Sequence, residues 1–281
     1  MPITVRDATS VDRSATAEVI YNAFHQLDER HDVPAYMNSK EDANIVASHL
    51  YGIPKIHGYV AEDDGQVIGV GFLHDLGDAG MGISPLAVSP RAQSRGAGQA
   101  ILDRMIERAG GASIRLLQDA FNNATLALYS RYGFVVQEQV TCITGKPPAP
   151  SPSAGTGLAI THDTDPAGTS EALHRAIMGF NRPSFPTRPV MAHRGADLAG
   201  FIAPGTEYPY AAADNEDTLM ALIAGLTAEL NAPVTIAIPA AHPQTLRWML
   251  DRDARVIRSM NLMVRGPYAR PNGARLTSGS Y

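Results

Sequence analysis

The sequence predicts an α/β fold (an α+β mixed sheet) that is built twice along a chain of 281 residues. Three observations lead to this prediction. Strand and helix patterns alternate through residues 1–145, a proline-rich segment interrupts them at 146–157, and a similar order of patterns returns at 158–268. Apolar positions with period two indicate strands and those with period 3.6 indicate helices. Residues 269–281 are polar, and we expect a flexible tail there.

The elements of the first unit follow from this periodicity. The expected strands cover residues 3–6, 58–62, 67–74, 81–88, 113–118 and 134–143. The expected helices cover residues 12–25, 39–50, 96–109 and 124–132. Ser39 and Asp42 form a capping-box pattern, and Asp64-Gly65 indicates a hairpin turn.

A linker and a repeat define the second unit. Four prolines and two glycines between 146 and 157 cannot sustain a helix or a central strand. An offset of 120 residues places the strand pattern 114–118 on 234–238, whereas the opening strands at Ile3 and Leu158 lie 155 residues apart. We infer a duplicated fold whose second copy lost about 35 residues, equivalent to a helix or a hairpin. An unrelated second α/β domain is the alternative.

Composition narrows the classes of function. The net charge is −5 without a block of Lys and Arg, which argues against a nucleic-acid partner. The single cysteine, Cys142, excludes an internal disulfide and is expected to be buried. No apolar stretch approaches the roughly 20 residues that span a bilayer, and the first ten residues do not resemble a signal peptide. We expect a cytoplasmic protein that binds no membrane.

The junction between residues 86–88 and the following helix is the first informative motif. A strand ends there, a loop follows, and a helix begins at Gly96 and Gly98. A helix start offers unpaired backbone N–H groups and a partial positive charge. Glycine lets a phosphate group approach these N–H groups without a Cβ in the way. The pattern therefore predicts a pyrophosphate site.

Neighbouring residues refine the interpretation of this loop. The pattern reads Gln93-x-x-Gly96-x-Gly98, and Arg91 and Arg95 could add positive charge at its rim. It is neither a dinucleotide fingerprint nor a P-loop, because Gly-x-Gly-x-x-Gly and Gly-Lys-Ser/Thr are absent. A glycine-tolerant helix start without a ligand is the alternative.

A second motif, from Asn122 to Phe134, agrees with the first in order and spacing. It reads Asn-x-x-Thr-x-x-x-Tyr-x-x-x-Gly-Phe, with tyrosine at 129. Together the two motifs resemble the GNAT superfamily of acyl-CoA-dependent N-acetyltransferases, and the resemblance covers about residues 1–145. Thr125 stands where the family has alanine.

The resemblance implies a GNAT-type acyltransferase fold with acetyl-CoA as co-substrate and no metal. The strand at 86–88 would bind the pantetheine arm through its backbone, and the loop at 93–98 would bind the pyrophosphate. Tyr129 would be the general acid that protonates the leaving thiolate, the alternative being a core aromatic residue. The implied cofactor-binding residues are Leu86, Ala87, Val88, Gln93, Ser94, Arg95, Gly96, Ala97, Gly98, Gln99, Asn122 and Tyr129.

A departure from the family concerns the general base. Many members carry a glutamate on the strand before the loop, where this chain has Gly82, and residues 81–88 contain no acid. His74, Asp75 and Asp78 are substitutes, although a solvated loop is the simpler interpretation of all three. The cluster at 25–32, with His25, Asp28, Glu29, His31 and Asp32, would cover the acceptor in the family or else form a charged surface loop.

The second unit lacks the motif residues. The 120-residue offset maps Gly96 and Gly98 to Glu216 and Thr218, and Tyr129 to Met249. We therefore expect a degenerate GNAT-like lobe that binds no coenzyme.

Two classes of function remain open, and within the enzyme class a larger acyl donor or a non-amine acceptor is a further alternative. The first is an N-acetyltransferase that acts on a small-molecule amine, as a monomer or homodimer. The alternative is a non-catalytic acyl-CoA-binding regulatory module. The missing carboxylate favours the alternative, and Tyr129 favours the enzyme.

Overall fold

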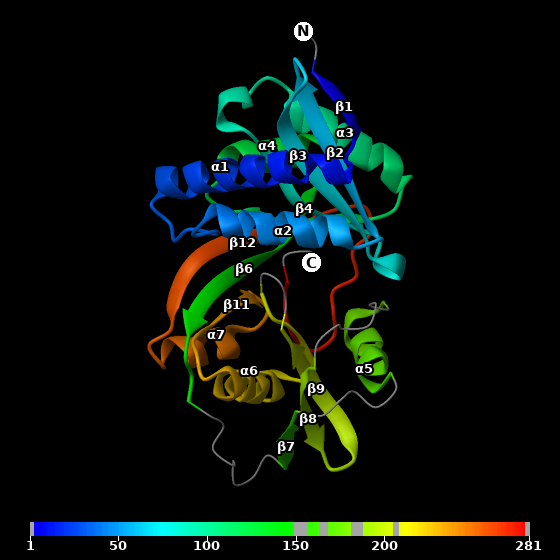
Figure 1. Ribbon diagram of the computed structural model, residues 1–281. Helices are drawn as coiled ribbons and strands as arrows, with labels where there is room; N and C mark the ends of the chain where they lie inside the picture. Colours follow the sequence, from blue (N-terminus) through cyan, green and yellow to red (C-terminus); the bar gives the residue numbers. More distant parts are fainter. Residues whose placement is uncertain (1–2, 149–156, 163–167, 181–187, 205–207, 279–281) are drawn as a thin grey trace.

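The computed structural model describes residues 3–148, 157–162, 168–180, 188–204 and 208–278 (Figure 1). In the first lobe the strands are β1 (Thr4–Asp7), β2 (Ile56–Asp63), β3 (Gln66–Asp75), β4 (Met81–Val88), β5 (Ile114–Asp119) and β6 (Val135–Gly145). Its helices are α1 (Arg13–His31), α2 (Lys40–Gly52), α3 (Ala97–Ala109) and α4 (Asn123–Arg131), with 3-10 turns η1 (Ser10–Asp12), η2 (Gly77–Ala79) and η3 (Pro90–Ala92). The mixed α/β fold is confirmed.

The second lobe repeats this order with fewer elements. Its strands are β7 (Leu158–Thr161), β8 (Val190–Arg194), β9 (Asp197–Ala203), β10 (Tyr210–Ala213), β11 (Val234–Pro239), β12 (Arg255–Arg265) and β13 (Ala274–Leu276). Its helices are α5 (Thr169–Met178), α6 (Glu216–Leu230) and α7 (Pro243–Leu250). Among the described residues, α5 alone lies between the first two strands, where the first lobe has α1 and α2. The expected loss of one element stays a prediction, because residues 163–167 and 181–187 of this interval lie outside the described residues.

Local sequence explains several boundaries in the first lobe. Asp64 and Gly65 have φ angles of 52° and 73°, as a two-residue type I′ hairpin requires, and they join β2 to β3. The Ser39 hydroxyl accepts a hydrogen bond from the Asp42 N–H, and the Asp42 carboxylate accepts one from the Ser39 N–H. This reciprocal capping box begins α2 where the sequence predicts it.

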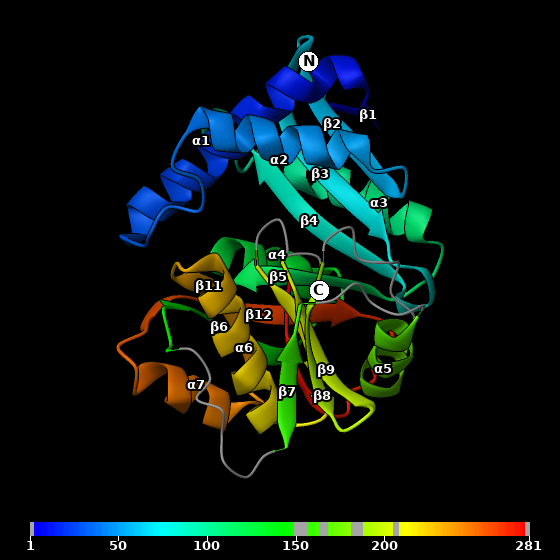
Figure 2. The same ribbon diagram turned by 60° about the horizontal axis from the view of Figure 1, so that its bottom comes forward.

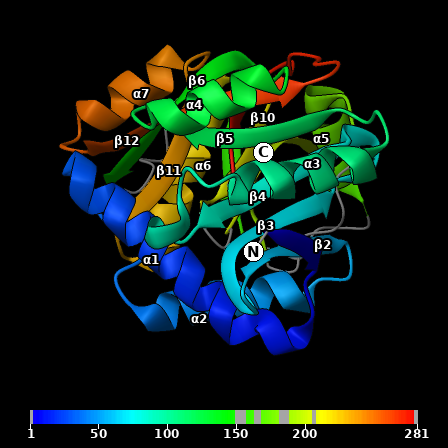
Figure 3. The same cartoon turned by 90° about the horizontal axis from the view of Figure 1, so that it is seen from above.

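The helices of the first lobe cover both faces of its sheet (Figure 3). Residues of α1 and α2 pack with Val60, Val70 and Phe72 in one apolar cluster. Residues of α3 and α4 pack with Leu73 and Leu116 in a second cluster on the other face. The first lobe therefore has a core on each side of its central strands.

The two lobes exchange one strand each, β6 and β12. The larger sheet has the order β1-β2-β3-β4-β5-β12-β6-β11, so β12 of the second lobe lies between β5 and β6 of the first (Figure 2). Both neighbours of β12 are antiparallel to it, and β6 in turn pairs with β11. The strands β6 and β12 occupy equivalent positions in the repeat, 135–145 and 255–265, which explains how each can fill the other's place.

The prediction of a flexible tail at 269–281 is wrong for residues 274–278. Residues 274–276 form β13, which pairs with β10, and the Thr277 N–H donates to the Ala237 carbonyl of β11. Leu276 is fully buried, and Arg275 forms an ion pair with Glu138. The polar composition was misleading because Arg275 is neutralised by a partner far away in the sequence.

Two other expectations concern the linker between the lobes and the absence of a membrane-spanning helix. Residues 149–156 of the expected linker lie outside the described residues, so the domain limits at 145 and 158 stay predictions. Within the described ranges, no helix is both long and apolar enough to cross a bilayer.

The strand exchange predicts that the lobes fold together. A fragment ending at residue 146 lacks β12, so it loses the hydrogen-bonding partner that both β5 and β6 have in the full chain. We expect this fragment to aggregate or to melt at a much lower temperature than the full chain, which should unfold in one calorimetric transition. A soluble, monomeric fragment with the melting temperature of the full chain would contradict this expectation.

Candidate active site

The candidate site begins where β4 and β5 separate. These parallel strands pair only at Met81 with Ile114 and at Gly82 with Arg115, and then diverge. An irregularity in the β3–β4 register at Ser84 and Pro85 accompanies the divergence. The separation opens into a cleft of about 1640 Å³ that extends from the loop before α3 to the second lobe.

The predicted pyrophosphate loop lies at this cleft. Gly96 is the N-cap of α3 with a φ angle of 93°, and no side chain caps the helix start. A Cβ on Gly98 would lie 3.4 Å from a Val88 methyl group, which is an ordinary van der Waals contact, so the start of α3 lies beside the end of β4. The first N–H groups of α3 therefore have no side-chain acceptor, as an anion site requires.

The predicted coenzyme residues come together with one exception. Those that line the cleft are Leu86, Ala87, Val88, Gln93, Ser94, Gly96, Ala97, Gly98, Gln99, Asn122 and Tyr129. Arg95 is not among the described residues that line it, because its guanidinium forms a 2.6 Å ion pair with Asp63 at the β2–β3 hairpin. Binding of coenzyme by these residues stays a prediction.

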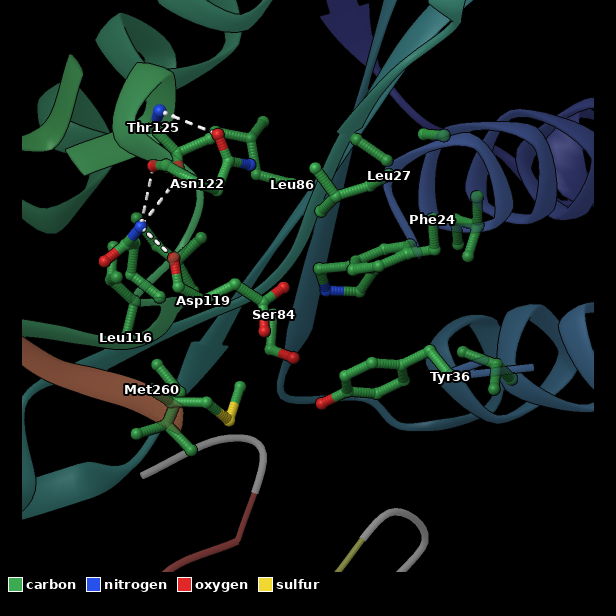
Figure 4. Close-up of a pocket in the computed structure, with 18 of the residues that line it drawn as sticks. Phe24, Leu27, Tyr36, Ser84, Leu86, Leu116, Asp119, Asn122, Thr125 and Met260 are labelled. Carbon is green, nitrogen blue, oxygen red and sulfur yellow. Dashed lines mark hydrogen bonds between the residues drawn. The ribbon is translucent and has the colours of Figure 1, made fainter. Parts of the chain in front are cut away.

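Hydrogen bonds fix the start of α4 and explain Thr125. The Asn122 side chain accepts a hydrogen bond from the Thr125 N–H at 3.3 Å (Figure 4). The Gln118 amide donates to the Thr125 hydroxyl at 3.1 Å and accepts from Asn261 of β12 at 2.9 Å. The hydroxyl that replaces the family's methyl group thus connects α4 to the exchanged strand.

Tyr129 lies in the cleft as an almost buried phenol. It is 6% exposed, and its ring packs edge-on against Phe134 with centroids 5.6 Å apart. Burial raises the pKa of Tyr129 well above its usual value, and the negative charge of Asp119 raises it further. The phenol is therefore protonated at neutral pH, which is the form that a general acid needs.

The residues considered as bases have different surroundings from those expected. His74 and Asp75 do not lie in a solvated loop, because β3 extends through both and pairs with β4. The His74 Nε2 atom donates to the Ser84 carbonyl at 2.6 Å, so Nδ1 is the unprotonated nitrogen. Burial lowers the pKa of His74. Asp78 lies in η2 and is exposed, and the Asp75 carboxylate accepts from the Gly77 N–H.

The cluster at 25–32 is part of a helix rather than a surface loop. The helix α1 continues to His31, and Asp28 on its inner face is 3% exposed. One Asp28 oxygen accepts from the Tyr36 N–H at 2.8 Å, and the other forms a 2.7 Å ion pair with Arg258 of β12. Arg258 is 4% exposed and also pairs with Asp119 at 3.0 Å.

These three residues form a buried charge triad, Asp28–Arg258–Asp119, that joins α1, β12 and β5. Arg258 also donates to the Pro34 carbonyl at 2.9 Å, and its guanidinium lies 4.5 Å from the centroid of the Tyr36 ring. Asp119 and Arg258 line the cleft. Sequence analysis missed both, because no local motif surrounds them and the strand exchange that brings them together leaves no pattern.

The equivalent region of the second lobe has no open helix start. Only Asp214 and Asn215 separate β10 from α6, in place of the eight residues between β4 and α3. The Asn215 side chain caps the Thr218 N–H, and the Glu216 carboxylate accepts from the Thr245 N–H at 2.6 Å. Met249, at the position equivalent to Tyr129, is fully buried in the core. The expectation of a degenerate second lobe is confirmed.

Comparison with known proteins agrees with this geometry. Residues 54–136 match the family model described as an acetyltransferase (GNAT) domain. A protein from Pyrococcus horikoshii assigned as an acetyltransferase superposes with a TM-score of 0.71 at 16% identity, over 95% of this chain and 90% of that one. Among curated proteins, none matches by sequence.

Two further solved structures cover the whole chain. A GCN5-related N-acetyltransferase from Sphaerobacter thermophilus has a TM-score of 0.68 at 13% identity, over 97% of this chain and 98% of that one. A tandem GNAT protein from the clavulanic acid biosynthesis pathway has a TM-score of 0.59 at 12% identity, over 95% and 100%. These likenesses confirm the GNAT fold in tandem.

The open α3 start predicts where coenzyme binds. Gly96→Glu places a carboxylate among the N–H groups expected to hold the pyrophosphate, so coenzyme A binding measured by calorimetry should be lost. Gly111→Glu is the matched control, because Gly111 has a φ angle of 94° at the far end of α3 with open space around it. Both variants should lose similar stability, and Gly111→Glu should keep one coenzyme site per chain. Equal affinity in the two variants would contradict the assignment.

The charge triad predicts a large loss of stability when Arg258 is removed. Arg258→Met leaves two buried carboxylates without their cation, and breaking a buried ion pair in this way typically costs about 3–5 kcal/mol. Arg255→Met on the same strand should cost less than about 0.5 kcal/mol, because Arg255 is exposed. Urea denaturation measures both free energies of unfolding, and equal values would contradict the prediction.

Proposed function

Since the chain carries a GNAT domain and has the tandem GNAT fold, we propose that it transfers the acetyl group of acetyl-CoA to the amine of a small molecule. The observation that carries the proposal is the position of Tyr129 in the same cleft as the open start of α3. The first feature suits acid catalysis at a thiolate, and the second suits the anchoring of a pyrophosphate.

The proposed reaction uses the two ends of the cleft differently. The pyrophosphate binds the N–H groups between Gln93 and Gly98, and the pantetheine arm lies along the edge of β4 that β5 leaves open. The bound amine first loses one proton to solvent. The neutral nitrogen then attacks the thioester carbonyl carbon, the C–S bond breaks, and the thiolate takes the proton of Tyr129. The proton that the new amide nitrogen gives up restores the Tyr129 phenol. A tyrosine phenol has an ordinary pKa of about 10, already above the value of about 8.5 for a thiol, and burial raises the pKa of Tyr129 further. The transfer therefore depends on close positioning more than on driving force.

The non-catalytic alternative has less support. It explains the missing carboxylate on β4 but gives no reason for a protonated phenol in the cleft. Release of free thiol from acetyl-CoA, tested with a panel of amines, distinguishes the two functions. Coenzyme binding without thiol release for any amine would favour the regulatory module. The monomeric or homodimeric state and the cytoplasmic location stay predictions.

The proposal predicts the effect of removing one hydroxyl group. Tyr129→Phe should lower kcat by about 10²–10⁴-fold, the usual contribution of a positioned acid, while the Kd for coenzyme A should change little. Tyr132→Phe is the matched control, because its phenol bonds Asp103 on the surface of α3 and does not contribute to the described lining of the cleft. Unchanged turnover in Tyr129→Phe would assign Tyr129 to packing alone.

A further inference from the structure

We propose that the acceptor is a cationic amine on an aromatic body, and that its ammonium group binds the Oδ2 atom of Asp119. This inference rests on the proposed function and names the substrate class for the same cleft. It follows from the bonding of Asp119, from the net charge around it and from the rings that face it.

The first argument concerns unequal use of the oxygens in the charge triad. Both Asp28 oxygens accept hydrogen bonds, one from the Tyr36 N–H and one from Arg258. The Asp119 Oδ1 atom accepts from Arg258, whereas Oδ2 accepts no hydrogen bond from any residue that the structure describes. The Asp119 side chain is 8% exposed and lines the cleft. A carboxylate oxygen that has no donor from the described residues, on a side chain that lines the cleft, is available to a donor from a ligand.

The second argument concerns charge. Two carboxylates share one guanidinium, so the triad has a net charge of −1 when both carboxylates are ionised. Burial raises the pKa of Asp119, and the Asp28 carboxylate adds to the effect while Arg258 opposes it. A cation that enters the cleft would balance the remaining charge, whereas an acceptor with its own carboxylate would be repelled.

The third argument concerns the opposite wall. Phe24 of α1 and Tyr36 lie across the cleft from Asp119 and Leu116 (Figure 4). The Phe24 and Tyr36 rings are 5.4 Å apart between centroids, and Tyr208 of the second lobe lies 6.4 Å from Tyr36. Leu27 and Met260 complete an apolar surface there. Aromatic rings and methionine favour a flat apolar body over a polar chain.

The charge arrangement also favours turnover. The amine substrate is a cation, but the acetylated product is a neutral amide that cannot form an ion pair with Asp119. The product therefore loses the interaction that held the substrate. Asp119 therefore discriminates between the amine substrate and the amide product without any movement of the protein.

The decisive experiment compares two ligands that differ at one group. Calorimetry on the protein saturated with coenzyme A measures the affinity for 2-phenylethylamine, which is a cation at pH 7, and for 2-phenylethanol, which is neutral. We expect the wild-type chain to bind the amine at least tenfold more tightly. Phenylalanine, which adds a carboxylate to the amine, should bind at least tenfold more weakly than the amine. Equal affinity for the amine and the alcohol would overturn the inference without any variant.

A pair of variants then tests Asp119 itself. Asp119→Asn keeps an oxygen for Arg258 and should abolish the preference for the amine over the alcohol. Asp28→Asn removes the same charge from the triad, but Asp28 is not among the described residues that line the cleft, so the preference should remain above fivefold. If Asp119 had only a structural role, its substitution would lower the affinity for both ligands equally and leave the ratio of the two affinities unchanged. If the Asp119→Asn variant still binds 2-phenylethylamine more tightly than 2-phenylethanol by the wild-type ratio, the inference is overturned.

Thiol release separates this inference from the proposed function. Release of thiol with several amines but without preference for a cation would leave the acetyltransferase function and overturn the anchor. A clear preference for the amine in binding, without thiol release from acetyl-CoA, would support the anchor and overturn the transfer reaction.

Discussion

The position of β12 between β5 and β6 is the constraint on which the rest of the molecule depends. A GNAT lobe that lent its last strand to a neighbour would leave β5 unpaired on one side, so the neighbour must return an equivalent strand. The two lobes consequently share the eight-stranded sheet, to which the second lobe contributes β11 and β12, while its other strands form a separate five-stranded sheet. Arg258 lies on this returned strand, and its ion pairs with Asp28 and Asp119 connect the exchange to the cleft.

The exchange gives the second lobe a role that its lost motifs do not suggest. Its α6 start is occupied by Asn215 and Glu216, so it has no place for a coenzyme of the kind expected in the first lobe. Its β12 nevertheless supplies Arg258 and Met260 to the cleft, and Asn261 donates to Gln118 of β5, which in turn donates to Thr125 in α4. The second lobe thus supplies the strand that lies between β5 and β6 of the first lobe.

Sequence analysis predicted the features that depend on neighbours along the chain. The open start of α3 needs Gly96 and Gly98 within three residues, and the α4 motif needs fixed spacing between Asn122 and Tyr129, so both are visible as patterns. The element order follows from periodicity and from the 120-residue offset. These are local properties, and local physics determines them.

The features that were missed depend on residues far apart in the sequence. Asp119 and Arg258 are separated by 139 positions, and Glu138 and Arg275 by 137. A charged residue is expected to be solvent-exposed unless its ion-pair partner is known. For this reason the sequence analysis offered a surface loop for Asp28 and a flexible tail for residues 274–278, although both are buried. Strand exchange preserves the periodicity of each strand and changes only its neighbours, so periodicity cannot reveal it.

The electrostatics of the cleft provide the last step in relating the fold to its chemistry. At one end, the start of α3 carries the partial positive charge of a helix dipole with no side-chain cap. At the other end, the triad carries a net negative charge. Under the proposed function, the anionic pyrophosphate of the coenzyme would be attracted to the start of α3 and the cationic amine of the acceptor to the triad. The proposed meeting place of the two substrates is the separation of β4 and β5, in the cleft that Tyr129 also lines.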